Sequence, residues 1–225
     1  MLPLIVVYEV GIRWYAHASG SEVQAQIAAS ALMRRFFLWF GATGTMLPAL
    51  AVIGILLAWH IARNDPWTIR PILYMGMVLE SAILTAPLIA LGMALPTSFP
   101  LMGLDGPSIN LMLLGLGAGV YEELVFRLIG LTFLNFLLAD VLRWSARPAL
   151  IGSVALSSIA FALYHYWGYE AFQWRSMVFR TLAGIYFAIL FLTRGFGISV
   201  GVHATYDIFV VLLRQIVPGD GELFS

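Results

Sequence analysis

The sequence predicts an all-α fold, a polytopic bundle of about six to eight transmembrane helices. Of the 225 residues, 61% are hydrophobic and only 11% are charged, which is far from the balance of a soluble domain. The apolar residues are gathered into stretches long enough for a helix to cross a hydrocarbon core about 30 Å thick. These stretches lack the two-residue alternation of a membrane-spanning strand, so a closed barrel is not expected.

Six stretches have the length and composition of a span. The first 16 residues are also apolar, but Glu9 and Arg13 interrupt them, so they could form a short first span or an interfacial helix. Breaks rich in Pro, Gly or charge separate the stretches. The predicted spans are residues 36–61, 71–95, 109–142 (enough for one and a half helices), 148–167, 175–193 and 196–216.

Composition also excludes several kinds of chemistry and partner. The chain has no cysteine, so any metal must be held by histidine and carboxylate side chains. Its net charge is zero and no basic run occurs, so nucleic acid is not expected as a partner. Membrane lipid is the surrounding that this composition requires.

The first functional candidate is the charged group in YEELVFR, residues 121–127, within the long third stretch. A charge at the centre of a bilayer costs on the order of 3 kcal/mol, so such residues usually face a polar interior. On a helix, Glu123 and Arg127 share a face, and Glu122 is turned about 100° away. The alternative is a structural ion pair at a helix start, with both carboxylates wetted by the nearby membrane surface.

Two further stretches place a histidine in an apolar span, near the end of one span and deep in the final one. His165 follows Phe161 by one helical turn in FALYHYWG, and a single histidine of this kind could simply be a packing or interfacial residue. His203 and Asp207 share a helical face in GVHATYD, and these two side chains could bond each other. Taken together, three spans bring polar groups that lipid tolerates only if they meet inside the bundle. They supply a base, two imidazoles and an orienting carboxylate, which is the set needed to activate water.

Other patterns are weaker. GISVG matches the nucleophile-elbow motif around Ser199, but that motif needs a strand, a turn and a helix, so chance explains it better. Asp207 has no second intramembrane aspartate to form a two-aspartate protease, because Asp140 lies beside a basic loop. Gly115 and Gly119 are better explained as a small-residue face for close helix packing than as a phosphate loop. The role of Glu80 stays open.

The three motifs in this order resemble the CPBP family, the CAAX protease and bacteriocin-processing family of intramembrane metalloproteases. That family includes CAAX prenyl endopeptidases related to the Ras-converting enzyme and bacterial immunity proteins. The matching stretches are EELVFR (122–127), FALYH (161–165) and HATYD (203–207), and the resemblance covers roughly residues 109–216.

No linker is long enough to divide the chain, so a single structural domain is expected. With the resemblance, it consists of weakly matching N-terminal membrane helices (1–108), a catalytic core (109–216) and a polar tail (217–225). It also implies a membrane-associated peptide or protein as the substrate. We expect the location to be a prokaryotic plasma (inner) membrane.

The roles implied by the resemblance follow the motifs residue by residue. Glu122 is the base that activates water, and His165 assists it or binds a metal. Glu123 and Arg127 complete the first motif, with the arginine holding a carboxylate. His203 and Asp207 hold the oxyanion of the tetrahedral intermediate or complete a metal site.

Zinc held by His165, His203 and Glu122 is the candidate cofactor, and a metal-free glutamate mechanism stays open beside it. Asparagine is common where this chain has Asp207, and an ionised aspartate cannot donate to an oxyanion. This departure favours a metal-bound site.

Two other functions remain as alternatives to an intramembrane endopeptidase. One is a non-catalytic immunity or scaffold protein that binds a peptide or a partner helix, although an idle protein has no need for costly intramembrane charges. The other is a small transporter, for which two repeated halves with broken helices would be expected, and no such repeat is found.

Overall fold

The computed structural model describes residues 2–19, 38, 43, 47–64, 66–68, 70–95, 108–167 and 171–216. Within these residues every regular element is a helix, which confirms the predicted fold class. The predicted tail 217–225 and most of the start of the predicted span 36–61 lie outside the described part. The elements are α1 (Leu2–Ser19), α3 (Leu47–Ala62), α4 (Pro71–Leu84), α5 (Ala86–Ala94), α6 (Ser108–Glu123), the π-helix η1 (Leu124–Leu131), α7 (Thr132–Phe136), the π-helix η2 (Leu137–Val141), α8 (Ala146–Tyr164), the 3-10 turn η3 (His165–Trp167), α9 (Trp174–Arg194) and α10 (Phe196–Ile216).

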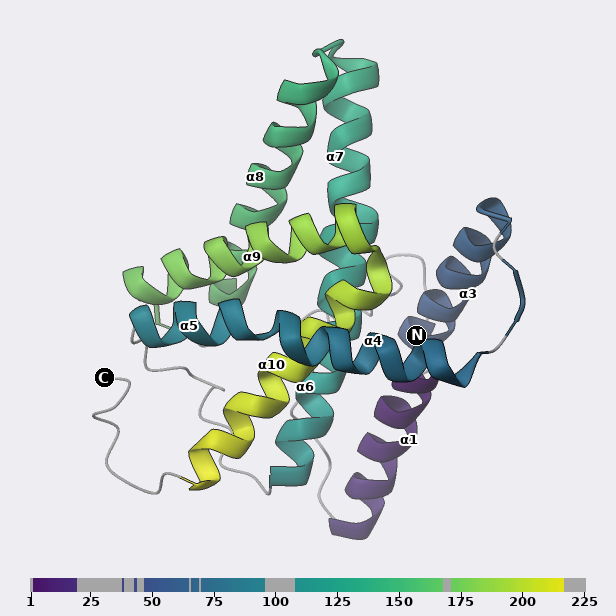
Figure 1. Ribbon diagram of the computed structural model, residues 1–225, viewed down its shortest axis with the longest axis vertical. Coiled ribbons are helices and arrows are strands. Elements are labelled where there is room, and N and C mark those ends of the chain that lie inside the picture. Colours follow the sequence, from purple (N-terminus) through teal and green to yellow (C-terminus); the bar gives the residue numbers. More distant parts are fainter. Residues whose placement is uncertain are drawn as a thin grey trace.

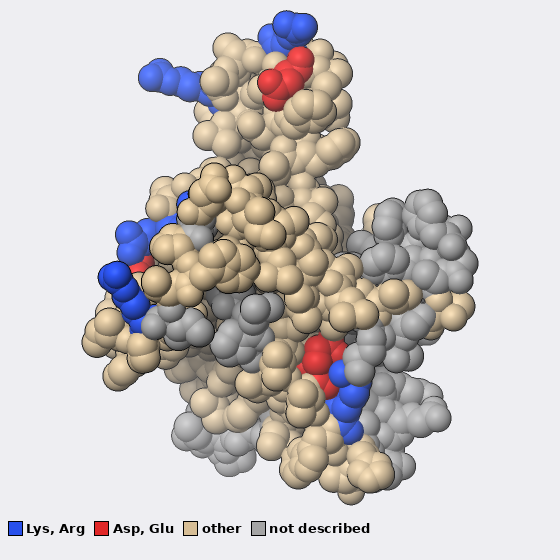
Figure 2. Space-filling model, turned by 90° about the vertical axis from the view of Figure 1, so that its right-hand side faces the viewer, with Lys and Arg blue, Asp and Glu red and all other residues tan. Residues whose placement is uncertain are grey.

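Five helical segments of the described part are long and apolar enough to cross a membrane. They are Pro71–Ala94, Ile109–Val141, Ala146–Trp167, Trp174–Arg194 and Phe196–Leu213. Five of the six predicted spans therefore correspond to such segments. The face drawn in Figure 2 is mostly uncharged, with basic and acidic side chains gathered in a few separate groups, as expected of an integral membrane protein.

Figure 1 shows how the helices are arranged around the middle of the molecule. α7 and α8 form an upright hairpin, α9 and the pair α4–α5 run across below it, and α10 crosses α6 in the lower half. α10 packs mainly along α6 and also against α4 and α9, whereas α8 packs along α9. The ends of α6 and α8 and the middle of α10 meet where these layers cross.

The first helix is held to α6 by polar as well as apolar contacts. Glu9 forms a 2.7 Å ion pair with Arg13, which lies one turn later on α1. The Tyr121 hydroxyl donates to the same Glu9 carboxylate at 2.6 Å. The two charges that interrupt this apolar stretch are therefore paired with each other, and Glu9 also accepts a bond from Tyr121, the residue that precedes Glu122.

The contact between α6 and α10 confirms the predicted small-residue face. A Cβ on Gly115 would lie 2.7 Å from the Asp207 Cβ, and one on Gly119 would lie 2.9 Å from the Ala204 backbone nitrogen and 3.1 Å from the Val200 carbonyl oxygen. Because backbone atoms of α10 occupy this space, only glycine lets the two helices approach so closely.

We expect Gly119→Ala to lower stability by about 1–3 kcal/mol, because an overpacked contact must force the two backbones apart. Gly76→Ala is the matched control, since a Cβ there meets nothing within 4 Å. The measurement is the melting temperature of both variants in one detergent. Equal melting temperatures would contradict the close packing of α6 on α10.

Two interruptions of the helices have local causes. The predicted span 71–95 is divided at Thr85 because Pro87, in the first turn of α5, has no N–H to donate and its ring clashes with the preceding turn. The Tyr186 hydroxyl donates to the Leu84 carbonyl at this break at 2.8 Å. The turn from α9 to α10 is Gly195, whose φ of 87° is favourable only for glycine.

The long predicted stretch 109–142 is one continuous segment in which the helix changes type. It is α-helical up to Glu123 and widens into η1 at Leu124, directly after the paired glutamates. The Phe126 carbonyl in η1 accepts a 2.6 Å bond from the Ser157 hydroxyl on α8. π-Helical segments inside α-helices often occur at functional sites.

Glu80 finds its partner far away in the sequence. Arg194 at the end of α9 donates through Nε to Glu80 Oε1 at 2.5 Å, and its Nη2 lies at the same distance from that oxygen. The structure therefore places Glu80, whose role the sequence left open, in an ion pair between α4 and α9.

Candidate active site

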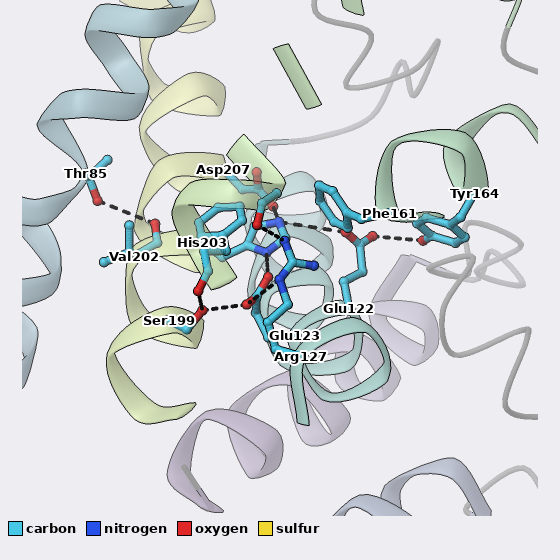
Figure 3. Close-up of polar contacts among 12 residues, drawn as sticks. Thr85, Glu122, Glu123, Arg127, Phe161, Tyr164, Ser199, Val202, His203 and Asp207 are labelled. Carbon is cyan, nitrogen blue, oxygen red and sulfur yellow. Dashed lines mark hydrogen bonds and ion pairs between the residues drawn. The ribbon is translucent and has the colours of Figure 1, made fainter. Parts of the chain in front are cut away.

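All six residues predicted for the site come together where α6, η1, η3 and α10 meet. Glu122 and Glu123 end α6, Arg127 lies on η1, His165 begins η3, and His203 and Asp207 lie one turn apart on α10. Figure 3 shows that Glu122, Glu123, Arg127, His203 and Asp207 gather around one point. Three separate predicted spans therefore contribute to a single polar cluster.

The His203 imidazole lies at the centre of the cluster. Its Nδ1 is 3.0 Å from Glu123 Oε1, and because a carboxylate only accepts, Nδ1 carries the proton. Its Nε2 then faces Glu122 Oε2 at 3.8 Å and Asp207 Oδ2 at 3.7 Å. The Phe187 ring stacks on the imidazole with centroids 4.5 Å apart and an interplanar angle of 13°. Both the plane and the tautomer of His203 are thus fixed by neighbours.

Glu123 is completely buried and is held through both carboxylate oxygens. The Ser199 hydroxyl donates to Oε2 at 2.5 Å, and His203 binds Oε1. Arg127 Nε lies 3.4 Å from Oε2, and both side chains of this pair are 0% exposed. Glu123 is therefore enclosed by protein groups, and it lies on the Nδ1 side of His203, away from Glu122.

Arg127 is the largest fully buried side chain of the described part. Its guanidinium carbon lies 4.4 Å from the Phe161 ring centroid and 5.4 Å from that of Phe187, so aromatic faces stabilise the charge. Its Nη2 donates to the Gly184 carbonyl at 3.2 Å. The arginine is thus held between α8 and α9 as well as by Glu123.

Glu122 faces the opposite side of His203 from Glu123. Its Oε1 accepts a 2.8 Å bond from the Tyr164 hydroxyl, so Oε2 is left to face the imidazoles. His165 Nε2 and His203 Nε2 each lie 3.8 Å from Oε2. His165 donates through Nδ1 to the Phe161 carbonyl at 2.8 Å, which leaves its Nε2 without a proton. One carboxylate oxygen and two imidazole nitrogens therefore face a common space.

The structure gives the contacts on which the alternatives for the single motifs depend. Glu123 and Arg127 do form an ion pair, but it is buried inside a continuous helical segment rather than wetted at a helix start. His203 hydrogen-bonds Glu123, whereas its separation from Asp207 is longer than a hydrogen bond. His165 is a neighbour of Glu122 and not an isolated interfacial histidine.

The side chains fit a bound cation in type and charge. Glu122, Glu123 and Asp207 bring three carboxylates to one cluster, whereas Arg127 is the fixed cation beside them, so a proton or a metal ion is favoured there. Each imidazole has its Nδ1 bound to an acceptor, the usual arrangement for a histidine that ligates through Nε2. Within the described ranges, however, no three His, Asp or Glu side chains already form a metal site.

Sequence reasoning missed Tyr164 and the bond that Ser199 makes to Glu123. Tyr164 is part of the FALYH stretch but carries no charge, so nothing in its own position marked it as the partner of Glu122. Ser199 was set aside as a nucleophile, and its place inside α10 agrees with that, yet its hydroxyl binds Glu123. The signal that could have identified Ser199 is its spacing of one helical turn from His203.

Comparison with protein families confirms the resemblance. Residues 105–209 match the model described as "Type II CAAX prenyl endopeptidase Rce1-like", and all three motifs lie within this range. Neither the curated proteins nor the solved structures contain a match to the chain. At family level the match is to CAAX-type intramembrane proteases. The segment 105–209, which carries the whole candidate site, is therefore similar to the Rce1-like family of type II CAAX prenyl endopeptidases.

Proposed function

We propose that the protein is an intramembrane endopeptidase that hydrolyses a membrane-associated peptide or protein with a water molecule activated by Glu122. The observation that carries this proposal is the meeting of Glu122 Oε2 with the Nε2 atoms of His165 and His203, each 3.8 Å away. A general base must reach its water within hydrogen-bonding distance, and this space is lined by acceptors suited to hold one.

The proposed reaction assigns the proton transfers to Glu122. As the water oxygen bonds to the carbonyl carbon of the substrate, Glu122 takes the proton of the water. It then gives this proton to the departing amide nitrogen as the C–N bond breaks. His165 orients the water from the other side, because its Nε2 lone pair faces Glu122 Oε2.

His203 and Asp207 are assigned to the charge that develops on the carbonyl oxygen. A protonated His203 can donate through Nε2 to this oxygen, whereas an ionised Asp207 cannot donate and instead favours the imidazolium. Glu123 and Arg127 are assigned positioning roles, because both are fully buried behind His203. Asp207 is therefore proposed to act through His203 rather than as a direct donor.

Zinc is the proposed cofactor in the alternative form of this mechanism. His165, His203 and Glu122 would hold it, and it would supply Lewis acidity and a more acidic bound water. Elemental analysis of the purified protein and of the His165→Ala/His203→Ala variant separates the two forms. About one zinc per chain that is lost in the variant supports a metal site. No zinc in either protein assigns water activation to Glu122 alone.

The substrate class can be tested directly in liposomes. The purified protein is reconstituted with three versions of one peptide, carrying a C-terminal prenyl group, an acyl anchor or no lipid, and products are identified by mass spectrometry. We expect cleavage of at least one membrane-anchored version, in a prokaryotic plasma-membrane lipid mixture that matches the location we propose. No cleavage of any version by folded protein would contradict the proposed function.

Tyr164→Phe should lower kcat about tenfold, an order typical of lost positioning bonds, because Glu122 Oε1 loses its donor and the carboxylate can rotate. KM should change little, since the hydroxyl binds the base and not the substrate. Tyr121→Phe is the matched control, because that hydroxyl binds the Glu9 carboxylate outside the site at 2.6 Å. Equal kcat values for the two variants would contradict the role given to Tyr164.

A further inference from the structure

Ser199 has no part in the proposed proton transfers, yet it is among the most constrained polar residues of the structure. It is 0% exposed, and its hydroxyl oxygen lies 2.5 Å from Glu123 Oε2 and 3.1 Å from the Phe187 carbonyl oxygen. A hydroxyl has one proton to donate, and the ionised carboxylate at the shorter distance is the stronger acceptor. The proton of Ser199 is therefore directed at Glu123.

Ser199 and His203 bind the two oxygens of the same carboxylate from one face of α10. Because they are separated by one helical turn, Ser199 meets Oε2 while His203 Nδ1 meets Oε1 at 3.0 Å. Figure 3 shows Ser199, Glu123 and His203 linked in this way. Both carboxylate oxygens of Glu123 are therefore held. This fixes the plane of the carboxylate and the position of Oε1, the oxygen that accepts the bond from His203.

The close contact between α6 and α10 that allows this arrangement is at Gly119, one helical turn before Glu123 on α6. Gly119 lies against the backbone of α10 between Val200 and Ala204, which follow Ser199 and His203 in the sequence. This close approach holds α10 near enough for both side chains to reach Glu123. The same helix face thus serves packing and the orientation of His203.

We infer that Ser199 is a positioning residue of the active site, which sets the orientation and the tautomer of His203 by holding Glu123 Oε2. The inference rests on the proposed function, because it assigns Ser199 to the same reaction. It also excludes Ser199 as the nucleophile, since its hydroxyl is buried and bonded to a carboxylate rather than to an imidazole.

The test compares Ser199→Ala with Ser153→Ala. Ser153 is equally buried at 0% exposure, but its hydroxyl binds the Ala149 carbonyl of its own helix at 2.7 Å, outside the site. We expect Ser199→Ala to lower kcat by about 10- to 100-fold with KM within about twofold. This range is typical when a residue that orients the groups of a site is removed. Ser153→Ala should leave both constants unchanged.

A second readout does not depend on activity. The chain contains four histidines, so ¹⁵N-histidine labelling gives a small set of ring signals, in which His203 is assigned from the spectrum of His203→Gln. In Ser199→Ala the His203 signals should move away from the Nδ1-protonated position, whereas those of His165 stay. Ser153→Ala should leave both sets in place.

The outcomes separate the inference from the proposed function. An unchanged His203 signal together with a normal kcat in folded Ser199→Ala overturns the inference. A loss of melting temperature with kcat per folded molecule unchanged also overturns it, because Ser199 is then only structural. If the parent protein cleaves no peptide, the proposed function fails, and a displaced His203 signal still shows that Ser199 orients this histidine.

Discussion

Glu122→Gln is expected to abolish hydrolysis while the protein inserts, folds and melts as the parent does. The substitution removes the base but keeps the shape, and the glutamine oxygen can still accept the bond from the Tyr164 hydroxyl. General base catalysis contributes about 10²- to 10⁴-fold to a rate, so the cleavage rate should fall by at least a factor in this range. The rate is measured as single-turnover cleavage in liposomes, with product detected by mass spectrometry.

The matched control for this variant is Glu80→Gln. Glu80 is also a carboxylate within an apolar helix, but it pairs with Arg194 between α4 and α9 rather than with the histidines. Glu80→Gln should therefore cleave at nearly the parent rate. If Glu122→Gln cleaves as fast as this control, the role of Glu122 as the base is wrong.

Arg127→Ala is expected to reduce the folded yield as well as the activity. It leaves the buried Glu123 carboxylate without its cation and removes a side chain packed against Phe161 and Phe187. Breaking a buried pair on one side costs about 3–5 kcal/mol, a large part of the stability of a typical domain. Yield of monodisperse protein and melting temperature are the measurements.

Arg194→Ala provides the comparison for the arginine. Its pair with Glu80 has side chains that are 55% and 29% exposed, and pairs of this kind contribute about 0–1 kcal/mol. The melting temperature should therefore fall far less than in Arg127→Ala. Similar losses in both variants would show that burial of the Glu123–Arg127 pair is not what stabilises the bundle.

The fold could be predicted largely from the sequence because the interior of a lipid bilayer permits few kinds of backbone structure. Long apolar stretches in a chain with few charges require helices whose backbone groups are satisfied internally. The change to a π-helix after Glu123 was not predictable, since no feature of the local sequence marks it, and neither was the bond from Ser157 on α8 to the Phe126 carbonyl in this segment. The partner of Glu80 was missed for the same reason, because Arg194 is distant in the sequence.

The charged members of the site could be predicted, whereas its uncharged members could not. Glu122, Glu123 and Arg127 stand out because each is costly in lipid, and this cost requires partners. Tyr164 and Ser199 carry hydroxyls that are common in apolar helices, where a serine usually binds its own backbone, as Ser153 does. Only the meeting of α6, α8 and α10 shows that these two hydroxyls bind the glutamates instead.

The most direct test of water activation is intact-protein mass spectrometry during single-turnover cleavage in ¹⁸O-labelled water. If Glu122 activates water, the new carboxyl group of the product carries one ¹⁸O atom and the protein keeps its unmodified mass at every time point. A transient mass increase equal to the acyl half of the peptide would reveal a covalent intermediate. That result would contradict the account, because it would assign the attack to a side chain such as Ser199 rather than to water.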